Sequence, residues 1–362
     1  MAVSTIDPNG LNIGQIGGTR NKIINGAMVI DQRNAGAAVT LSGELPVDRF
    51  TMINTSDGAF SAQQVSEAPS GFTKSVKVTT TTADGTLTAA QNMHLRQPIE
   101  GFNVADLGWG TAAAQAITIS FWVRSSLTGT FGGSLRNSAS TRAYAFTYSI
   151  SVADTWEYKT VTIAGDTTGT WLTDNGLGVL VSWGLGAGPD RSGAAGSWAG
   201  AIYVSATGAV SLIGTLNATW QITGVQLEAG DTATPFEHRS YGQELALCQR
   251  YFAKSYRQNV APGTANPTNY EGQVNGSVGA ANSTSLKSTA FYLPVSMRSA
   301  PTVTLYDRAG NLNKVSADNV GSYTDNQNYG LSTAGEQVCV VFMNNGANCG
   351  TLAFFYTVSA EL

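Results

Sequence analysis

Short stretches in which apolar and polar residues alternate recur along this sequence. Residues 117–121, 144–150 and 161–163 show the period of two that is expected of β-strands with one buried face. Turn signals such as Asp84-Gly85 and Asn175-Gly176 separate these stretches. Strands do not alternate regularly with long helical segments, which disfavours a parallel α/β sheet. The pattern therefore predicts an all-β protein built as a sandwich or jelly roll.

The clearest helix signal lies between residues 220 and 252, directly after a strand-like run. The strand alternation breaks at Gly224, and a glycine at such a phase shift indicates a β-bulge or a close backbone approach. Ser240 and Gln243 then have the spacing of a capping box, which predicts a helix over 241–252. Four residues share one apolar face of this helix: Tyr241, Leu245, Cys248 and Phe252. A helix this short needs tertiary or quaternary packing to be stable.

Changes in composition divide the chain into segments. Residues 1–20 are rich in Gly and Asn and have too few apolar residues for a core, so we expect either a floppy terminus or an arm that becomes ordered on a partner. We predict a first β domain over 21–237, a connecting helix within 238–254, a linker over 255–270, and a second, C-terminal β domain over 271–362. Within the second domain, residues 318–333 have the composition of a polar loop that exposes aromatic residues.

The charge of the chain argues against several classes of partner. The 362 residues carry a net charge of −4, and only 12% of them are charged. Nothing therefore attracts the whole molecule to nucleic acid or to an anionic membrane. The first residues lack the basic and apolar regions of a cleaved signal peptide, and no stretch approaches the roughly 20 apolar residues of a membrane span. We expect no nucleic-acid partner and no membrane insertion.

The sequence offers little for catalysis or metal binding. His94 and His238 are the only histidines, and neither His-x-x-x-His nor Cys-x-x-Cys spacing occurs, so we expect no transition-metal site. A phosphate-binding loop and the sequence context of a nucleophilic serine are absent as well. Carboxylates of the first domain are scattered, without a spacing that favours the pair that glycoside hydrolysis needs: Glu67, Glu100, Asp106, Glu157, Asp166 and Asp174. We expect no catalytic residues and no cofactor.

The three cysteines are expected to be free and buried. Cys248 lies on the apolar helix face and has the character of a small core residue. Cys339 and Cys349 flank a turn signal at residues 344–346, but a two-residue Asn-Gly turn would place Cys339 opposite Leu352. Free thiols are therefore favoured, and a disulfide between Cys339 and Cys349 is the alternative.

Aromatic residues are the candidates for binding a carbohydrate, because their rings stack on the C–H face of a sugar while nearby polar groups bond its hydroxyls. One candidate cluster is Tyr323 and Tyr329 with Asp325 and Asn326, for which an ordinary surface loop is the competing interpretation. The other is Trp109 with Trp198, for which packing in the core competes.

A set of short segments between residues 21 and 256 carries a family resemblance. The segments are Ile24-Asn25-Gly26-Ala27-Met28 with Gln32-Arg33, Val47-Asp48-Arg49-Phe50, Ile99-Glu100-Gly101-Phe102, Ser120-Phe121-Trp122-Val123-Arg124-Ser125, Ser134-Leu135-Arg136-Asn137, Asp154-Thr155-Trp156-Glu157-Tyr158, and residues 225–230 with 233–252. Together they resemble tail-fibre and related minor structural proteins of bacteriophages. The resemblance implies a jelly-roll β-sandwich like a carbohydrate-binding module, carried on a virion and assembled in the host cytoplasm.

The resemblance also implies partners. Members of this family are commonly trimeric, which implies a homotrimer in which Tyr241, Leu245, Cys248 and Phe252 contact other copies near the threefold axis. Residues 1–20 become the arm that anchors the chain to a virion protein. Jelly-roll carbohydrate modules often hold a structural calcium ion, although no residue pattern here indicates one.

Three functions are compatible with these features. The first is a virion fibre or spike subunit that attaches to a bacterial surface glycan without catalysis, through loops of residues 271–362. The second is a structural head fibre or adaptor that decorates the capsid. The third is a depolymerase that cleaves surface polysaccharide. The low charge and the absence of catalytic motifs favour the first.

Overall fold

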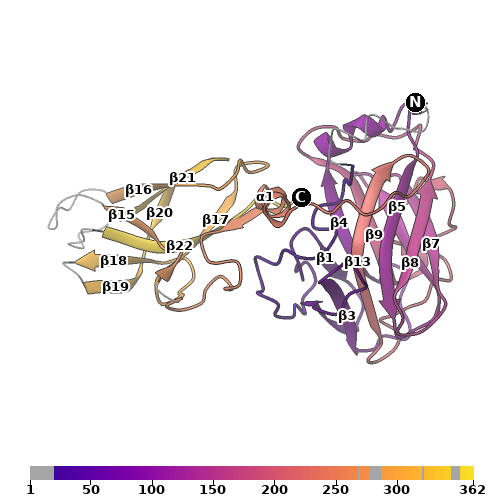
Figure 1. Cartoon of the computed structure of the whole chain (residues 1–362), viewed down its shortest axis with the longest axis horizontal. Coiled ribbons are helices and arrows are strands. Elements are labelled where there is room, and N and C mark those ends of the chain that lie inside the picture. Colours follow the sequence, from indigo (N-terminus) through magenta and orange to yellow (C-terminus); the bar gives the residue numbers. More distant parts are fainter. Residues whose placement is uncertain (1–19, 268–269, 278–286, 320–321, 344–350) are drawn as a thin grey trace, which may run out of the picture.

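The computed structural model describes residues 20–267, 270–277, 287–319, 322–343 and 351–362. These residues form two β domains at opposite ends of an elongated molecule, with the helix α1 (Tyr241–Gln249) between them (Figure 1). Almost all regular structure in the described residues is β. The expected all-β fold, with one short helix at the junction and a second β domain, is confirmed.

Two antiparallel sheets form the first domain. One has the spatial order β1 (Thr51–Asn54), β4 (Asn92–Glu100), β9 (Leu177–Ala187), β6 (Gly129–Arg136), β7 (Ala143–Ile150) and β11 (Trp198–Ala199). The other has the order β2 (Ala59–Val65), β3 (Ser75–Thr82), β13 (Thr219–Ala229), β5 (Ile117–Ser125) and β8 (Glu157–Ile163). Many neighbouring strands are distant in sequence, as β1 and β4 or β3 and β13 are. This crossing connectivity is typical of a jelly roll.

Apolar side chains from both sheets fill the space between them. Leu95 and Trp183 come from the six-stranded sheet, Phe121 and Trp220 come from the five-stranded sheet, and all four are fully buried. The rings of Phe121 and Trp183 lie 5.9 Å apart, edge to face, so aromatic contacts connect the two sheets. Because strand residues alternate between two faces, the same strands place their other residues on the outside of the sandwich.

Strand β13 contains the predicted bulge. Its pairing with β5 shifts register between Thr223 and Gln226. Gly224, within the shift, has a φ of 62°, which glycine adopts without strain. A Cβ atom at this position would also lie 2.6 Å from the ring of Phe72. Both the backbone conformation and the available space therefore require glycine here.

Helix α1 begins where the sequence predicts but ends earlier. The side chain of Ser240 accepts a hydrogen bond from the Gln243 backbone, and the Ser240 backbone donates one to the Gln243 side chain, which confirms the capping box. The predicted end at residue 252 is wrong, because Phe252 begins strand β14 (Phe252–Lys254). The backbone of β14 pairs with β22 (Thr351–Ser359), and these tertiary hydrogen bonds outweigh the local helix preference.

The second domain is organised around β22. This strand pairs antiparallel with β14, β15 (Val274–Ser277), β17 (Thr302–Tyr306) and β18 (Val315–Asn319), and β18 pairs in turn with β19 (Ser322–Gln327). A smaller sheet has the order β16 (Lys287–Tyr292), β21 (Val338–Met343) and β20 (Gly330–Ala334). Phe291, Leu305 and Phe354 are among the buried side chains of a second core.

The structure differs from the sequence-based predictions at two places in this region. The prediction of a loop over residues 318–333 is wrong, because β19 and β20 occupy most of that segment. Their small polar residues form strands through backbone pairing with β18 and β21. Residues 255–267, predicted as part of a linker, pack onto the second domain. Tyr256 is buried there, with its ring stacked on that of Phe355 at 4.4 Å.

Charged side chains join the parts of the molecule around α1. Glu100, at the end of β4, accepts hydrogen bonds from Arg250 at 2.6 and 2.9 Å and one from the Tyr251 hydroxyl at 2.6 Å. Glu361 pairs with Arg33 and Arg49. A small apolar cluster lies beside these contacts and includes Ile24, Ile30, Cys248 and Tyr251. The helix end and the last residues of the chain are thereby tied to the first domain.

Candidate functional site

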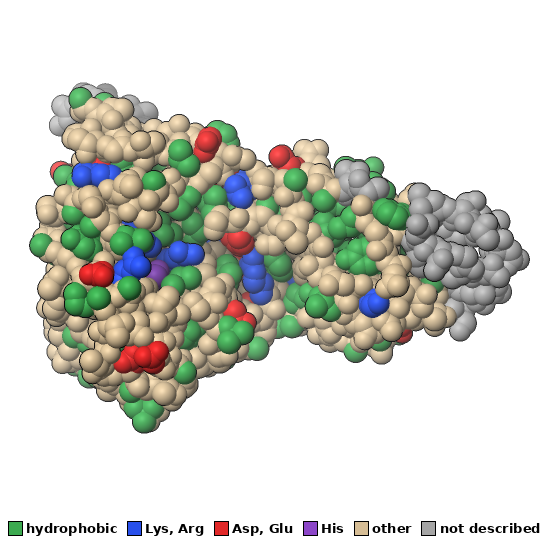
Figure 2. Space-filling model, turned by 180° about the vertical axis from the view of Figure 1, so that it is seen from behind, with side chains coloured by type: hydrophobic (Ala, Val, Ile, Leu, Met, Phe, Trp, Pro, Cys, Tyr) green, Lys and Arg blue, Asp and Glu red, His purple; other side chains and the backbone are tan. Residues whose placement is uncertain are grey.

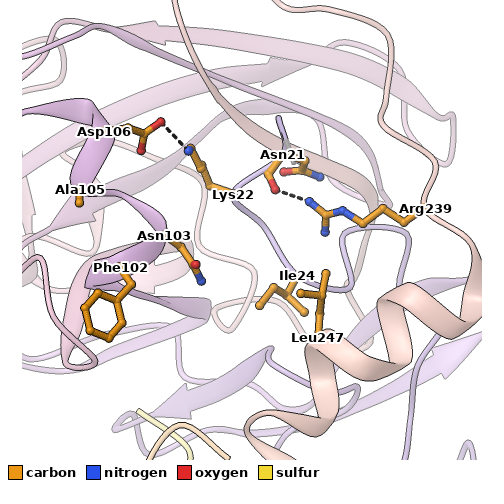
Figure 3. Close-up of a pocket in the computed structure, with 9 residues that line it drawn as sticks. All are labelled: Asn21, Lys22, Ile24, Phe102, Asn103, Ala105, Asp106, Arg239 and Leu247. Carbon is orange, nitrogen blue, oxygen red and sulfur yellow. Dashed lines mark hydrogen bonds and ion pairs between the residues drawn. The ribbon is translucent and has the colours of Figure 1, made fainter. Parts of the chain in front are cut away.

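A pocket of 420 Å³ lies where the first domain meets α1 (Figure 3). Its volume is in the range of pockets that hold small ligands. It is lined by the segment that precedes the first strands, by the 3₁₀ turns η2 (Gly101–Asn103) and η3 (Ala105–Leu107), and by α1 and the residue before its cap: Asn21, Lys22, Ile24, Phe102, Asn103, Ala105, Asp106, Arg239 and Leu247. We call it the junction pocket.

The η2 turn presents an aromatic ring at the edge of the junction pocket. Gly101 begins this turn, and a Cβ atom there would lie 2.5 Å from a backbone carbonyl oxygen of the segment before β9. The backbone N–H groups of Gly101 and Phe102 donate to the carbonyls of Gly176 and Asp174, at 2.8 and 2.9 Å. The turn is held against the sandwich in this way, while the Phe102 side chain is 60% exposed (Figure 3).

Polar groups complete the junction pocket. Lys22 Nζ lies 2.7 Å from Asp106 Oδ2, and the Asn103 side chain is exposed beside them. On the opposite side, Arg239 donates to the carbonyl of Ile23 at 3.1 Å and to that of Asn21. Figure 3 shows Lys22, Asn103 and Arg239 around one central space. The pocket therefore combines an exposed aromatic ring with amide, ammonium, guanidinium and carboxylate groups.

This combination is suited to binding a saccharide. An aromatic ring can stack on the C–H face of a sugar, and the surrounding groups can donate to or accept from its hydroxyls. Asp106 is the one acidic residue among the lining residues, and it is paired with Lys22. Hydrolysis of a glycosidic bond uses two carboxyl groups that flank the bond. The pocket offers groups for binding without such a pair.

Sequence analysis did not identify Phe102 and Asn103 as site residues. The available signal was an aromatic residue between Gly101 and a polar neighbour, in a segment without strand alternation. Exposure of the ring depends on the contacts of η2 with the segment before β9, which is more than 70 residues away in sequence. That contact is not encoded in the local pattern.

The tryptophan candidates pack against one another. The ring of Trp109 lies 4.7 Å from that of Trp171 and 5.4 Å from that of Trp198, in edge-to-face arrangements. Trp109 is only 7% exposed, and its indole N–H donates to Gln115. Trp198 is half-buried, and its N–H donates to a backbone carbonyl. Packing, the alternative to sugar stacking for Trp109, is what the structure shows, because strand β11 and two loops bring these indoles together as a packed cluster.

The tyrosine candidates lie on or beside β19, and other side chains of the second domain already contact their rings. The Arg308 guanidinium lies 4.0 Å from the centre of the Tyr323 ring, and Tyr329 is half-buried against the second core. Asp325 accepts a hydrogen bond from Ser316 at 2.6 Å. Asn326, with a φ of 64°, is exposed, and its backbone N–H donates to an aspartate at 2.6 Å. These four residues therefore contribute to the structure of the second domain.

The helix residues predicted to contact other copies are mostly covered by their own chain. Cys248 is fully buried, and Phe252 is 7% exposed beneath the Arg33 guanidinium, which lies 3.8 Å from its ring centre. Leu245 is half-buried against the small apolar cluster, and Tyr241 is 53% exposed. The expectation that Cys248 and Phe252 reach a neighbouring subunit is corrected, because the first domain already covers them.

The described cysteines, Cys248 and Cys339, are free and buried, and Cys349 lies outside the described residues. Burial raises the pKa of the Cys248 thiol well above its usual value, which disfavours the reactive thiolate. No group of three or more His, Cys, Asp and Glu side chains in the described part of the chain could hold a metal ion. No helix among the described residues is long and apolar enough to cross a membrane.

Comparisons with known proteins found similar solved structures only. No protein-family model matches this sequence, and no curated protein matches it. Among solved structures, the tailspike protein 4 enzymatically active domain of bacteriophage CBA120 aligns with a TM-score of 0.29 and 12% identity. The alignment covers 58% of this chain and 22% of that one, so this chain matches about a fifth of the tailspike domain.

Carbohydrate-binding modules are also among the similar structures. A family 11 module of Clostridium thermocellum, solved with a β-1,3-1,4-mixed-linked tetrasaccharide, aligns at a TM-score of 0.28 and 13% identity over 56% of this chain and 99% of that one. A family 61 module in complex with β-1,4-galactotriose aligns at a TM-score of 0.28 and 7% identity, over 59% and 100% of the two chains. This chain is thus similar, at low identity, to a phage tailspike domain and to carbohydrate-binding modules.

Proposed function

We propose that this protein is a subunit of a virion fibre or spike that attaches to a bacterial surface glycan without cleaving it. The observation that carries the binding step is the junction pocket, which the polar groups of Lys22, Asn103 and Asp106 line and at whose edge the exposed Phe102 ring lies, directed away from the pocket centre in Figure 3. The virion context is supported by the sequence segments that resemble phage fibre proteins. The residues that line the pocket include members of three of those segments, namely Ile24, Phe102, and Arg239 with Leu247.

The proposal assigns a role to each group in the pocket. The Phe102 ring stacks on the apolar face of one sugar residue, and the Asn103 amide and the Lys22 ammonium bond its hydroxyls. Attachment without cleavage is supported by the single, ion-paired carboxylate of the pocket. A sugar bound in this way meets no second carboxylate among the residues that line the pocket.

Replacing Phe102 by alanine should weaken binding to host cells or to purified surface polysaccharide by about tenfold, because loss of one stacking ring removes about 1.4 kcal/mol. Binding of labelled protein to cells and biolayer interferometry on immobilised polysaccharide would measure this. Tyr292→Ala is the matched control, since Tyr292 is 79% exposed on β16 in the second domain. That control should bind as the wild type does.

Two results would contradict the proposal. If Tyr323→Ala abolishes binding and Phe102→Ala does not, the glycan site lies in the second domain, as the sequence suggested. If the purified protein releases oligosaccharides from the polysaccharide, the attachment is accompanied by cleavage and the depolymerase interpretation replaces this one.

Self-association and anchoring are further parts of the proposal. Single glycan sites bind weakly, and repetition in a homotrimer multiplies them. Light scattering at micromolar concentration should give about three times the monomer mass of 37.7 kDa, and a mass near the monomer value would reject the trimer. Residues 1–20, of which 1–19 lie outside the described residues, supply the arm that docks on a virion protein, so a chain without residues 1–20 should fold but stay absent from particles.

A further inference from the structure

The outward face of the six-stranded sheet carries five polar side chains on three adjacent strands. Arg96 of β4, Ser182 of β9 and Ser134 of β6 are paired in one row across the sheet. His94 lies two residues before Arg96 on β4, and Arg136 lies two residues after Ser134 on β6. Because alternate residues share a face, all five project to the same side, away from the apolar core. We call this set the sheet-face cluster.

The sheet-face cluster is largely buried, and several of its polar atoms lack partners. Ser134 and Ser182 are fully buried, His94 is 3% exposed and Arg136 is 5% exposed. Five of its polar atoms have no hydrogen-bond partner among the described residues: His94 Nε2, Arg96 Nε, Ser134 Oγ, Arg136 Nε and Ser182 Oγ. A buried polar atom without a partner costs free energy, and native proteins rarely leave several together. Water or an external polar group would satisfy them.

The charge of the cluster is strongly positive. Arg96, Arg136 and Arg191 all act electrostatically on His94, and none of these arginines forms an ion pair within the described residues. Burial, together with Arg96 and Arg191, lowers the pKa of Arg136 to about 10, which reflects the absence of a compensating anion. Figure 2 shows basic side chains gathered beside a histidine on the surface of the larger domain. This concentration of positive charge occurs in a chain whose net charge is −4.

His94 adds an acceptor to this positive environment. Burial and the nearby arginines lower the pKa of His94 well below its ordinary value, so the imidazole is neutral at physiological pH. His94 Nδ1 lies 2.8 Å from Asn92 Oδ1, while the Asn92 amide nitrogen donates to Thr55 and Ala90. Since Asn92 Oδ1 can only accept, Nδ1 carries the proton. Nε2 is then an acceptor and suits a hydroxyl donor of a ligand.

A crossing segment forms a wall beside the cluster. The turn η4 (Pro189–Arg191) brings Arg191 to the site, and β12 (Ser205–Ala206) then passes over β6 and β9. Gly132 and Gly184 make room for it, since a Cβ atom at either position would lie within 2.5 Å of an atom of Ser205. This segment covers the row in which Gly132, Gly184 and His94 lie side by side on β6, β9 and β4. The row of Arg96, Ser182 and Ser134 lies beside it on the same face.

We propose that the sheet-face cluster binds a carboxylated sugar residue, with the carboxylate on Arg96 and Arg136 and a neighbouring hydroxyl donating to His94 Nε2. Guanidinium groups bind carboxylates with two parallel hydrogen bonds, and a sugar acid offers a hydroxyl next to its carboxylate. Arg191 at the rim attracts the anion. The cluster is separate from the junction pocket and does not depend on the role proposed for Phe102.

Calorimetric titration of the full chain with sodium D-glucuronate tests this site. The comparison ligands are D-glucose, which lacks the carboxylate, and acetate and inorganic phosphate, which lack the sugar. We expect glucuronate to bind at least tenfold more tightly than each of the three, and more weakly as salt concentration rises. Arg96→Gln should weaken glucuronate binding at least tenfold, and Arg191→Gln, at the half-exposed rim, should weaken it to a smaller extent.

Two control variants test whether a loss of glucuronate binding is specific to the sheet-face cluster. Arg124→Gln removes a half-buried arginine from β5 in the other sheet and should leave glucuronate binding unchanged, as should Phe102→Ala. Thermal unfolding of each variant without ligand verifies folding. Binding of glucuronate that is no tighter than that of glucose, or wild-type binding by both Arg96→Gln and Arg191→Gln, would overturn the proposal. Equal affinity for phosphate or acetate would replace it with a general anion site.

Discussion

Replacing Trp183 by alanine should lower the free energy of unfolding of the first domain by about 3–5 kcal/mol. The Trp183 side chain is fully buried between the two sheets and contacts the rings of Phe50 and Phe121, at centroid distances of 6.2 and 5.9 Å. Alanine would leave a cavity at the place where the two sheets meet. Chemical denaturation followed by circular dichroism would measure the loss.

Trp183→Phe is the control for this variant. The indole Nε1 of Trp183 is buried and has no hydrogen-bond partner among the described residues, so its removal costs no hydrogen bond. Phenylalanine keeps most of the aromatic volume, and we expect a loss of about 1–2 kcal/mol. A loss as large as that of the alanine variant would show that the phenylalanine ring does not restore the packing of this position.

Replacing Glu100 by alanine should destabilise the attachment of the helix end to the first domain by about 2–3 kcal/mol. Removing one member of a buried ion pair typically costs about 3–5 kcal/mol. The Glu100 side chain is 1% exposed, but that of Arg250 is 33% exposed, so water compensates part of the loss. The Tyr251 hydroxyl, which is buried, loses its partner as well. Hydrogen exchange of the α1 amides and denaturation of the whole chain would detect this.

The effect of Glu100 should depend on pH. Burial alone would raise the pKa of Glu100, but the hydrogen bonds from Arg250 and Tyr251 outweigh it and hold the pKa below its ordinary value of 4.5. A carboxyl group with a lowered pKa stabilises the folded state above the ordinary value, and this stabilisation disappears as pH falls through the folded pKa. The stability difference between wild type and Glu100→Gln should therefore be constant near pH 7 and shrink below about pH 4. A difference that grows on acidification would contradict this account.

The features that could be predicted from the sequence are those fixed by neighbouring residues. Alternation predicted the strands, Gly224 predicted the bulge, and the spacing of Ser240 and Gln243 predicted the start of α1. The end of α1 could not be predicted, because Phe252 joins β22, a strand about 100 residues later. Likewise, residues 322–334 have loop composition, and only pairing with β18 and β21 makes them strands.

The candidate sites depend even more on distant contacts. Trp109 lies among glycines, as an exposed residue often does, yet Trp171 from another loop and Trp198 from strand β11 pack with it. The polar character of Ser134 and Arg136 was visible in the sequence, but their convergence with His94 required the strand order β4, β9, β6. A pattern of period two gives the face on which a residue lies. It does not give the strand that lies beside it.

The central position of β22 has a consequence for the order in which the molecule forms during translation. All strands of the sandwich are synthesised before β22, which spans Thr351–Ser359. Until then β14, β15, β17 and β18 lack their common neighbour and keep unpaired edges, the kind of surface on which nascent chains aggregate. The pairing of Glu361 with Arg33 then closes a loop of 328 residues, and a contact between residues so far apart in sequence forms slowly. Growing chains of this protein are therefore expected to pass through a stage in which the sandwich is complete and the second domain still lacks its central strand.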